Sequence, residues 1–560
     1  MTAEVMTLGR LLDGRFRFRL TCFQRAYAWR TEHVVRLLSD LFHAMQQRGN
    51  KRRYALGRLM LSQQPGAADT ELVDGHQRLL TLTMLFAVLR DLETDAVRAD
   101  ALHRLISDDN WGDKDPRRYR IIIQSLPAPL FDRLVQQRGA TDNEPEIPRE
   151  SLSESERNIL ENRECIRSEL LAPGTTDQFR RDLADFLLQS CYVLAVVVDN
   201  QEDAWDMLAR ENDTRLLFSH ADEAKSVILS GMRREDHIPA ARLWESCESF
   251  LNPEDIYRLL SHIRAIHWRG RVQSSRPVES EIAERISLSV DGLRFMSEQF
   301  VPYANRLRDL RHKLVGRPGI ERESVAQHIE YLSWVDPHAW VPAALQWMKV
   351  AGTEGPDTVE FFRRLDRLVW LSKIAGVDPG VQETRILNLI AQIEANTGLA
   401  GLTKLDVDAK LQADALGNLR SINFGAKHWA GYLLRRLSIL HGTDPGPILR
   451  DEVTLEHVLP KNPPSNSEWR RIFGSPEACK AHCQRIGNMV LLSGRENNHE
   501  SGTRPWREKR EIFAQSAFVL ARDAASESEW TAKTIDRRTN RLIETLFAHW
   551  GLEPTQKTAS

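Results

Sequence analysis

The 560-residue sequence has few cysteines, no long apolar run and almost no net charge. Its six cysteines are scattered along the chain, a pattern that favours reduced thiols in the cytoplasm over a disulfide framework. Residues 1–18 contain no continuous apolar stretch, which argues against a signal peptide. No apolar run approaches the roughly 18 residues that cross a bilayer, so we expect no membrane contact.

The charge balance carries no overall signal for nucleic acid. Lys and Arg number 76 and Asp and Glu 78, which gives a formal net charge of −2, so any such function must rest on local features. With 42% hydrophobic residues, the chain has ample material for cores. Its length allows about three or four domains of roughly 100–200 residues each. We predict a multidomain, predominantly helical α+β protein, divided into residues 1–230, 231–444 and 445–560.

Hydrophobic periodicity and turn residues predict the order of elements. The expected elements are a helix over 32–47, strands over 54–62 and 71–73, an apolar helix over 79–92, a strand over 191–198 and almost wholly helical structure over 236–441. The segments 139–156 and 269–281 are polar and are expected to be loops or linkers.

Two short apolar segments and a charged helix follow one another near the C-terminus. TLEHVLP, residues 454–460, is a predicted strand that ends at a proline, and IGNMVLLSGRENN, residues 486–498, contains the second strand. In GTRPWREKREIF, residues 502–513, Thr503 is the expected N-cap and Pro505 belongs to the first turn of a helix. The predicted order is strand, strand, helix.

These elements carry the groups that phosphodiester hydrolysis needs, a base that activates water and a cation that holds the scissile phosphate. A neutral His457 can be the base near pH 7. Glu456 and Asn497 offer the hard oxygen ligands that suit Mg²⁺ or Mn²⁺. The side-chain amide of Asn488, or its backbone carbonyl, is placed to hold the imidazole in the useful tautomer.

The motif resembles that of the HNH, or His-Me finger, nucleases, which have a ββα-metal fold. Carried over by position, His457 matches the general base and Asn488 the residue that orients it. Glu456 and Asn497 match the metal ligands, although many such enzymes have aspartate or histidine where this chain has glutamate.

Two points stay open in this assignment. Asn498 and His499 directly follow Asn497, so the third metal-site position could be any of the three. A buried Glu-His pair at a strand end, with asparagines that only form turns, is the plainer alternative.

The same region is locally basic, since residues 461–510 hold ten Lys and Arg against five Glu. The side chains that could contact DNA phosphates are Arg504, Arg507, Lys509 and Arg510, although such a run is often a solvated helix face. Cys479, His482 and Cys483 raise the question of a zinc site. A structural zinc needs four ligands and no second pair lies nearby, so helix packing is the expected role.

A second polar cluster lies near the N-terminus. Gln24 and Arg25 stand in FQRAYAWR, and Gly57 lies within a predicted strand. DGHQR places Asp74, Gly75, His76, Gln77 and Arg78 before the apolar helix. Free backbone N–H groups and a guanidinium at a helix start favour phosphate binding, with the carboxylate available for a metal or an attacking water. A capped helix with a surface arginine explains the pattern about as well.

Together these segments resemble the N-terminal domain of the GmrSD-type modification-dependent (type IV) restriction enzymes, a ParB/sulfiredoxin-like nucleotide-binding unit. A later motif of that family matches partly in ARENDTRLLFSHADEAKSVIL, where Asn212, Asp222 and Lys225 fall at the right spacing. Thr214 and Arg215 replace the family's Arg-Gly pair, which leaves nucleotide preference and hydrolysis open.

The resemblance covers about residues 7–230 and 445–520, in the family's own domain order. It implies a cytoplasmic anti-phage nuclease that cuts double-stranded, modified DNA with a divalent cation and is regulated by an NTP such as GTP or UTP. The implied nucleotide contacts are Gln24, Arg25, Gly75, His76, Gln77, Arg78, Asn212, Asp222 and Lys225, with Asp74 and Arg78 as catalytic residues.

Two alternatives remain at this point. One is an RNA nuclease, and the other is a nucleotide-switched DNA- or partner-binding protein with an inactive HNH site. The oligomeric state, with a homodimer among the candidates, stays open.

Overall fold

The computed structural model describes residues 2–47, 53–64, 66–67, 69–107, 119–124, 128–142, 147–148, 152–199, 219–270, 276–396, 398–442, 453–493 and 502–554. Contacts group the chain into an N-terminal unit, residues 1–261 and 273–305, and a C-terminal unit, residues 262–272 and 306–560. The division predicted at 230 and 444 stays a prediction. In the described ranges, no helix is both long and apolar enough to cross a membrane.

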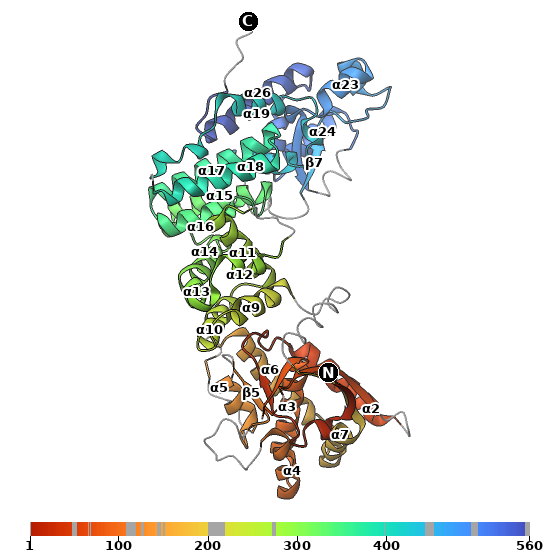
Figure 1. Cartoon of the computed structure of the whole chain (residues 1–560). Helices are drawn as coiled ribbons and strands as arrows, with labels where there is room; N and C mark the ends of the chain where they lie inside the picture. Colours follow the sequence, from red (N-terminus) through yellow and green to blue (C-terminus); the bar gives the residue numbers. More distant parts are fainter. Residues whose placement is uncertain are drawn as a thin grey trace. The chain divides into compact units, whose positions relative to one another are not determined.

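The N-terminal unit contains a mixed six-stranded sheet (Figure 1). Across the sheet the strands are β1 (Thr2–Thr7), β6 (Cys191–Val198), β3 (Tyr54–Ser62), β4 (Thr70–Asp74), β2 (Phe18–Leu20) and β5 (Ile121–Ile123). The pairs β1–β6 and β3–β4 are antiparallel, whereas β3–β6, β2–β4 and β2–β5 are parallel. The three predicted strands are confirmed, and β4 extends one residue beyond each end of its prediction.

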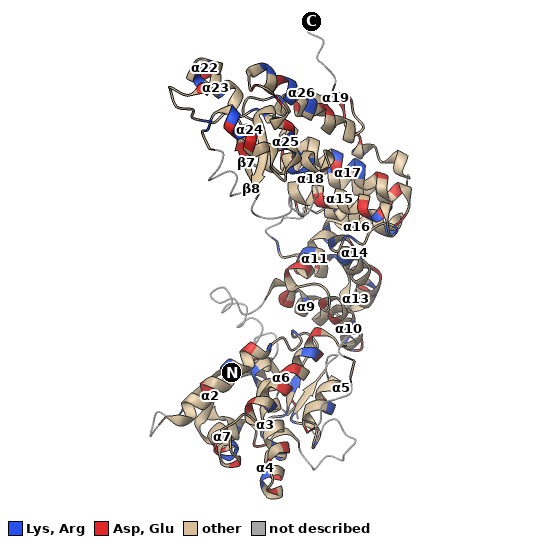
Figure 2. Cartoon of the chain, turned by 180° about the vertical axis from the view of Figure 1, so that it is seen from behind, with Lys and Arg blue, Asp and Glu red and all other residues tan. Residues whose placement is uncertain are grey.

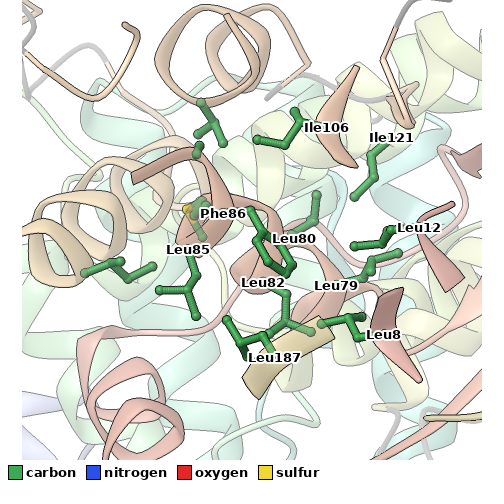
Figure 3. Packing of buried hydrophobic residues seen from close by; sticks show 14 of the residues in the cluster. Leu8, Leu12, Leu79, Leu80, Leu82, Leu85, Phe86, Ile106, Ile121 and Leu187 are labelled. Atoms are coloured by element: carbon green, nitrogen blue, oxygen red, sulfur yellow. The ribbon is translucent and has the colours of Figure 1, made fainter. Parts of the chain in front are cut away.

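Helix α3 (His76–Leu92) runs through the core of this unit. Every residue from 79 to 90 is buried, so the helix is covered on all sides. Figure 3 shows its leucines in a cluster that includes Ile121 and Leu187. The helix begins three residues before the predicted start because Gly75 is its N-cap with φ of +92°, a left-handed conformation that glycine adopts without strain.

The remaining helices of the sheet-containing region are α1 (Leu8–Leu11), α2 (Thr31–Gln46), α4 (Ala96–Ile106), α5 (Ala128–Phe131), the π-helix η3 (Asp132–Gln136), α6 (Glu154–Leu170) and α7 (Asp177–Ser190). The helix predicted over 32–47 is confirmed as α2. Helix α6 begins inside the segment predicted to be a loop, because Ser153 and Glu156 form a capping box in which each side chain accepts from the other residue's N–H.

The stretch predicted to be almost wholly helical is confirmed where it is described. Its elements, with the helix that precedes them, are α9 (His220–Ser230), α10 (His237–Glu248), α11 (Pro253–Trp268), α12 (Val278–Arg285), α13 (Leu288–Phe295), η5 (Met296–Phe300), α14 (Val301–Arg311), α15 (Ile320–Val335), α16 (Val341–Val350), α17 (Pro356–Ala375), α18 (Pro379–Glu394), η6 (Leu399–Gly401), η7 (Thr403–Leu405), α19 (Ala409–Leu419), η8 (Phe424–Ala426) and α20 (Ala430–Leu440). Helix α12 starts within the predicted linker 269–281.

The two strands and the following helix predicted near the C-terminus are confirmed, but two short helices and a 3₁₀ turn lie between the strands. The elements are β7 (Val453–His457), α22 (Glu468–Phe473), α23 (Pro476–Cys483), η9 (Ile486–Asn488), β8 (Met489–Ser493), α24 (Trp506–Ala514), α25 (Val519–Ala525) and α26 (Ala532–His549). β7 and β8 form an antiparallel hairpin. The predicted cap of the charged helix is wrong, because Pro505 and not Thr503 is the N-cap of α24.

Candidate active site

The β7–β8 hairpin places Glu456 and His457 close to Asn488. His457 is the last residue of β7 and pairs with Met489, the first residue of β8, so Asn488 lies opposite the point where β7 ends. The three polar side chains are 8%, 9% and 0% exposed, respectively. Buried polar groups in proteins are almost always hydrogen-bonded, so their partners define what each can do.

Asn488 fixes the chain that follows His457. Its Oδ1 accepts from the N–H of Leu459 at 2.8 Å and from Nε1 of Trp530 at 2.9 Å. Its Nδ2 donates to the carbonyl oxygens of Leu459 and Cys483, at 3.0 and 2.8 Å. Both amide hydrogens are therefore used on carbonyl groups, and neither is left for the imidazole. Asn488 thus supports His457 through the main chain and not by a side-chain bond to the ring, and its carbonyl oxygen accepts from the N–H of Val458 at 2.9 Å.

The imidazole of His457 faces Gln484, the residue that caps α23. Its Nε2 lies 3.3 Å from Oε1 of Gln484. Burial lowers the pKa of His457, and the contact with Gln484 opposes that effect only in part. The ring is therefore the free base near pH 7, the form that can accept a proton from water. Gln484 was not predicted from the sequence as a site residue. It is a polar residue four positions before Asn488, and no motif distinguishes it from its neighbours.

Glu456 is ion-paired with Lys509 of α24. The Nζ atom of Lys509 lies 2.6 Å from Oε1 of Glu456 and donates to the carbonyl oxygen of His457 at 2.8 Å. Lys509 is completely buried. The ammonium of Lys509 is thus turned into the domain in this structure, and its predicted contact with DNA phosphates stays a prediction. The sequence does contain a signal for this burial. Lys509 lies three residues after Trp506 and four before Phe513, which is the spacing of one helix face, and all three residues are buried on α24.

Three other predicted DNA-binding residues, Arg504, Arg507 and Arg510, are exposed. Figure 2 shows basic and acidic residues together on α24, and Arg504 lies 3.4 Å from Glu508. Their contact with DNA stays a prediction. Asn497 and its alternatives Asn498 and His499 lie outside the described residues, so the third metal-site position also stays a prediction.

In the N-terminal unit, two arginines lie near the Asp74 carboxylate at the turn before α3. Arg58 of β3 lies 3.3 Å from Asp74 Oδ2. Arg78 lies near the same carboxylate, and its partial burial lowers the pKa of its guanidinium. Gly57 makes room for Arg78, because a Cβ atom at position 57 would lie 2.9 Å from its Nη1. The sequence predicted Asp74 and Arg78 as neighbours, but Arg58 was missed.

The other predicted nucleotide contacts next to this turn bond to the protein itself. The amide of Gln24, which is buried, donates to the carbonyl oxygens of Leu72 and Val73. Gln77 accepts from the N–H of Ala28 at 2.8 Å and donates to the carbonyl oxygen of Ala26 at 3.0 Å. These side chains hold the segment after β2 against the turn.

His76 and Arg25 belong to the same arrangement. Nε2 of His76 lies 3.1 Å from the carbonyl oxygen of Arg25, whose side chain is exposed. Burial lowers the pKa of His76, so it is neutral and carries no charge for a phosphate. Gly75 and Arg25 keep their predicted roles as proposals.

Of the partly matched family motif of Asn212, Asp222 and Lys225, the structure describes only the last two residues, and Asn212 lies outside the described residues. Asp222 forms the capping box of α9, with its Oδ2 2.7 Å from Oγ of Ser219. Lys225 is completely buried, and its Nζ lies 3.3 Å from Glu248 and 3.8 Å from Glu245. In this structure both acidic residues of α10 already neutralise Lys225, and its role as a nucleotide contact stays a prediction.

A group that could hold a metal ion lies elsewhere in the C-terminal unit. His328, Asp366 and His549 each offer a ligand atom, and these atoms lie within 4.8 Å of one another. His328 Nδ1 is 2.8 Å from Asp366 Oδ2. Arg436 forms two bonds of 2.7 Å to the same carboxylate, and both members of this ion pair are fully buried. A cation would therefore compete with a guanidinium that already matches the charge of Asp366.

The residues considered for zinc, Cys479, His482 and Cys483, lie on α23. Burial raises the pKa of both thiols, which disfavours the thiolate form that binds zinc. Within the described ranges they do not meet the geometry of a metal-binding group. The burial of both cysteines agrees with a packing role.

Comparison with known families covers both regions. Residues 8–229 match the model of the GmrSD restriction endonuclease, N-terminal domain, and residues 413–545 match that of the GmrSD restriction endonucleases, C-terminal domain. A search of curated proteins found no match. Asp74 and Arg78 lie within the first matched region, and His457, Asn488 and Lys509 lie within the second. The two matches together span more than half of the chain, which therefore belongs to the GmrSD restriction endonuclease family, a family that cleaves DNA in restriction.

Proposed function

We propose that this restriction endonuclease cleaves DNA at an HNH-type site with His457 as the general base. The observation that carries the proposal is a neutral, nearly buried imidazole at the end of β7, beside Glu456 and in a strand-strand-helix arrangement. Asn488 holds the chain on the far side of His457, so the base stands on a rigid support. A free imidazole near pH 7 can accept a proton from the attacking water.

Glu456 would hold Mg²⁺ or Mn²⁺ together with Asn497, Asn498 or His499. Carboxylate and amide oxygens are the ligands that these cations prefer. When bound, the cation supplies charge stabilisation at the scissile phosphate. The chain's own contribution is the Lys509 ammonium, which fixes the Glu456 carboxylate and would share it with a cation.

The turn formed by Arg58, Asp74 and Arg78 is the proposed NTP site. One guanidinium group can bind two phosphate oxygens at once, through two parallel N–H···O bonds. The guanidinium groups of Arg58 and Arg78 both lie at this turn, at the start of a helix. Asp74 would then be available for a metal or a water near the phosphates. GTP and UTP are the first nucleotides to test, and double-stranded modified DNA is the proposed substrate.

His457→Ala tests the catalytic assignment. We expect this variant to lose divalent-cation-dependent DNA cleavage while its thermal unfolding and NTP binding stay as in the wild type. His428→Ala is the matched control, because His428 is exposed in the same unit. Cleavage at the wild-type rate by His457→Ala would refute the assignment.

A cleavage assay on a set of nucleic acids tests the proposal against an RNA nuclease and against a binding protein with an inactive site. The set contains phage DNAs that differ only in modification, with RNA of matched sequence, each with and without the NTPs and with Mg²⁺ or Mn²⁺. A binding protein with an inactive site is the second candidate, favoured by the ion pair that occupies Glu456. It predicts nucleotide-dependent DNA binding without cleavage in every condition. Cleavage of RNA alone would indicate an RNA nuclease.

A further inference from the structure

The ring of His457 needs a support that the hairpin does not provide. A neutral imidazole carries its proton on one of two nitrogens, and only the other can accept a proton from water. The main chain of His457 is held by Met489 and by Lys509, and Asn488 uses both amide hydrogens on carbonyl groups. These bonds place the Cα atom of His457 but do not choose its tautomer.

Gln484 is the side chain that meets the ring. Its Oε1 atom lies 3.3 Å from Nε2 of His457, and an amide oxygen can only accept a hydrogen bond. With this partner, neutral His457 carries its proton on Nε2 and donates it to Gln484. The lone pair is then on Nδ1, on the other edge of the ring.

Gln484 is itself held by a segment about sixty residues earlier in the chain. The N–H of Gly425, in the 3₁₀ turn η8, donates to the carbonyl oxygen of Gln484 at 2.8 Å. A Cβ atom at position 425 would lie 2.5 Å from Gln484 Oε1 and 1.7 Å from Cε of Met489. Glycine at this position therefore lets the amide and the first residue of β8 pack against the turn.

We propose that Gln484, seated against Gly425, is a positioning residue that keeps the proton of neutral His457 on Nε2 and leaves Nδ1 as the base. Naming Nδ1 as the base rests on the proposed function. The tautomer itself does not, because it can be measured whether or not the protein cleaves DNA.

Nitrogen NMR of the full-length chain tests the tautomer directly. The protein is labelled with ¹⁵N in histidine, and the His457 signals are those lost in His457→Ala. At a pH where the ring is neutral, we expect the Nε2–H pattern in the wild type. Gln484→Glu, which can only accept, retains that pattern, whereas Gln484→Met, of similar size and without an amide oxygen, should show a larger share of the Nδ1–H form, because only the intrinsic preference of imidazole for Nε2–H then remains. An Nδ1–H pattern in the wild type, or an unchanged pattern in Gln484→Met, would overturn the proposal.

Kinetics provide the second measurement. On the alkaline plateau, Gln484→Met should lower kcat by roughly 10- to 100-fold with little change in KM, as is usual when the partner of an active-site histidine is removed. Gln484→Glu should restore most of kcat, and equal loss in both variants would contradict a positioning role. Gly425→Ala should behave like Gln484→Met, whereas Gly431→Ala is the control, because a Cβ there meets no described atom within 4 Å. Absence of cleavage in the wild type would refute the proposed function and leave the NMR result to decide the tautomer.

Discussion

The Nζ atom of Lys509 lies 2.6 Å from Oε1 of Glu456, and both side chains are almost fully removed from water. The same ammonium donates to the carbonyl oxygen of His457. One buried cation therefore joins the carboxylate of the predicted metal ligand to the main chain of the predicted base. Such a pair offsets the cost of burying two charges only while both partners are present.

Replacement of Lys509 by methionine should destabilise the C-terminal unit. Loss of one partner leaves a buried carboxylate without its counter-charge, which typically costs about 3–5 kcal/mol. Thermal unfolding followed by calorimetry should show a clear fall in the melting temperature of this unit. Because Glu456 then loses its anchor, cleavage should fall as well.

Arg507→Met is the matched control, since Arg507 lies on the same helix and is exposed. A change at such a site is usually within about 0.5 kcal/mol. The double variant Glu456→Gln with Lys509→Met should recover part of the lost stability, since it removes both charges. Equal melting temperatures for the Lys509 and Arg507 variants would show that the ion pair contributes nothing.

Substitution of Gly57 by alanine should weaken NTP binding through Arg78. The φ angle of Gly57 is +91°, and the new Cβ atom would lie 2.9 Å from Arg78 Nη1. The guanidinium would have to shift from its present position, so we expect a higher Kd for the NTP in titration calorimetry. Backbone strain alone should cost on the order of 1 kcal/mol of stability.

Gly66→Ala separates the effect of backbone strain on stability from the effect of a displaced Arg78 on NTP binding. Gly66 has a similar φ of +81°, but a Cβ atom there meets no described atom within 4 Å. This variant should share the loss of stability and keep the wild-type Kd. If both variants bind NTP equally well, Arg78 does not contact the nucleotide.

His549 should make the stability of the C-terminal unit depend on pH. Burial, followed by the charge of Arg436, lowers the pKa of His549 from 6.5 to about 4. As pH falls, the ring of the unfolded chain takes up a proton near 6.5 and that of the folded chain only near 4. The contribution of His549 to stability is therefore complete above pH 6.5 and is lost as pH falls toward about 4.

Denaturant midpoints measured across this window test the prediction. His549→Gln, which cannot take up the proton, should show a shallower fall in the midpoint than the wild type. His428→Gln, at an exposed position, should follow the wild-type curve. Identical curves for His549→Gln and the wild type would exclude His549 as the titrating group.

Local patterns in the sequence determined the elements that carry the site. Tyr54–Ser62 was predicted as a strand because its residues alternate in character, and Cys191–Val198 because a short continuous run of apolar residues, many of them β-branched, suits a strand buried on both faces. The polar groups of the C-terminal motif lie within a few residues of predicted strand ends. Their order along the chain was therefore enough to bring Glu456, His457 and Asn488 together.

The sequence alone determined which residues are present at the hairpin, whereas the tertiary structure decided what each one contacts. Lys509 and Arg507 are both basic residues of one helix, but only packing against β7 buries the first. Gln484 and Gly425 are unremarkable in the sequence because their meeting depends on chain segments about sixty residues apart. Contacts of this kind depend on how helices pack around the hairpin, and the order of residue types does not specify that packing locally.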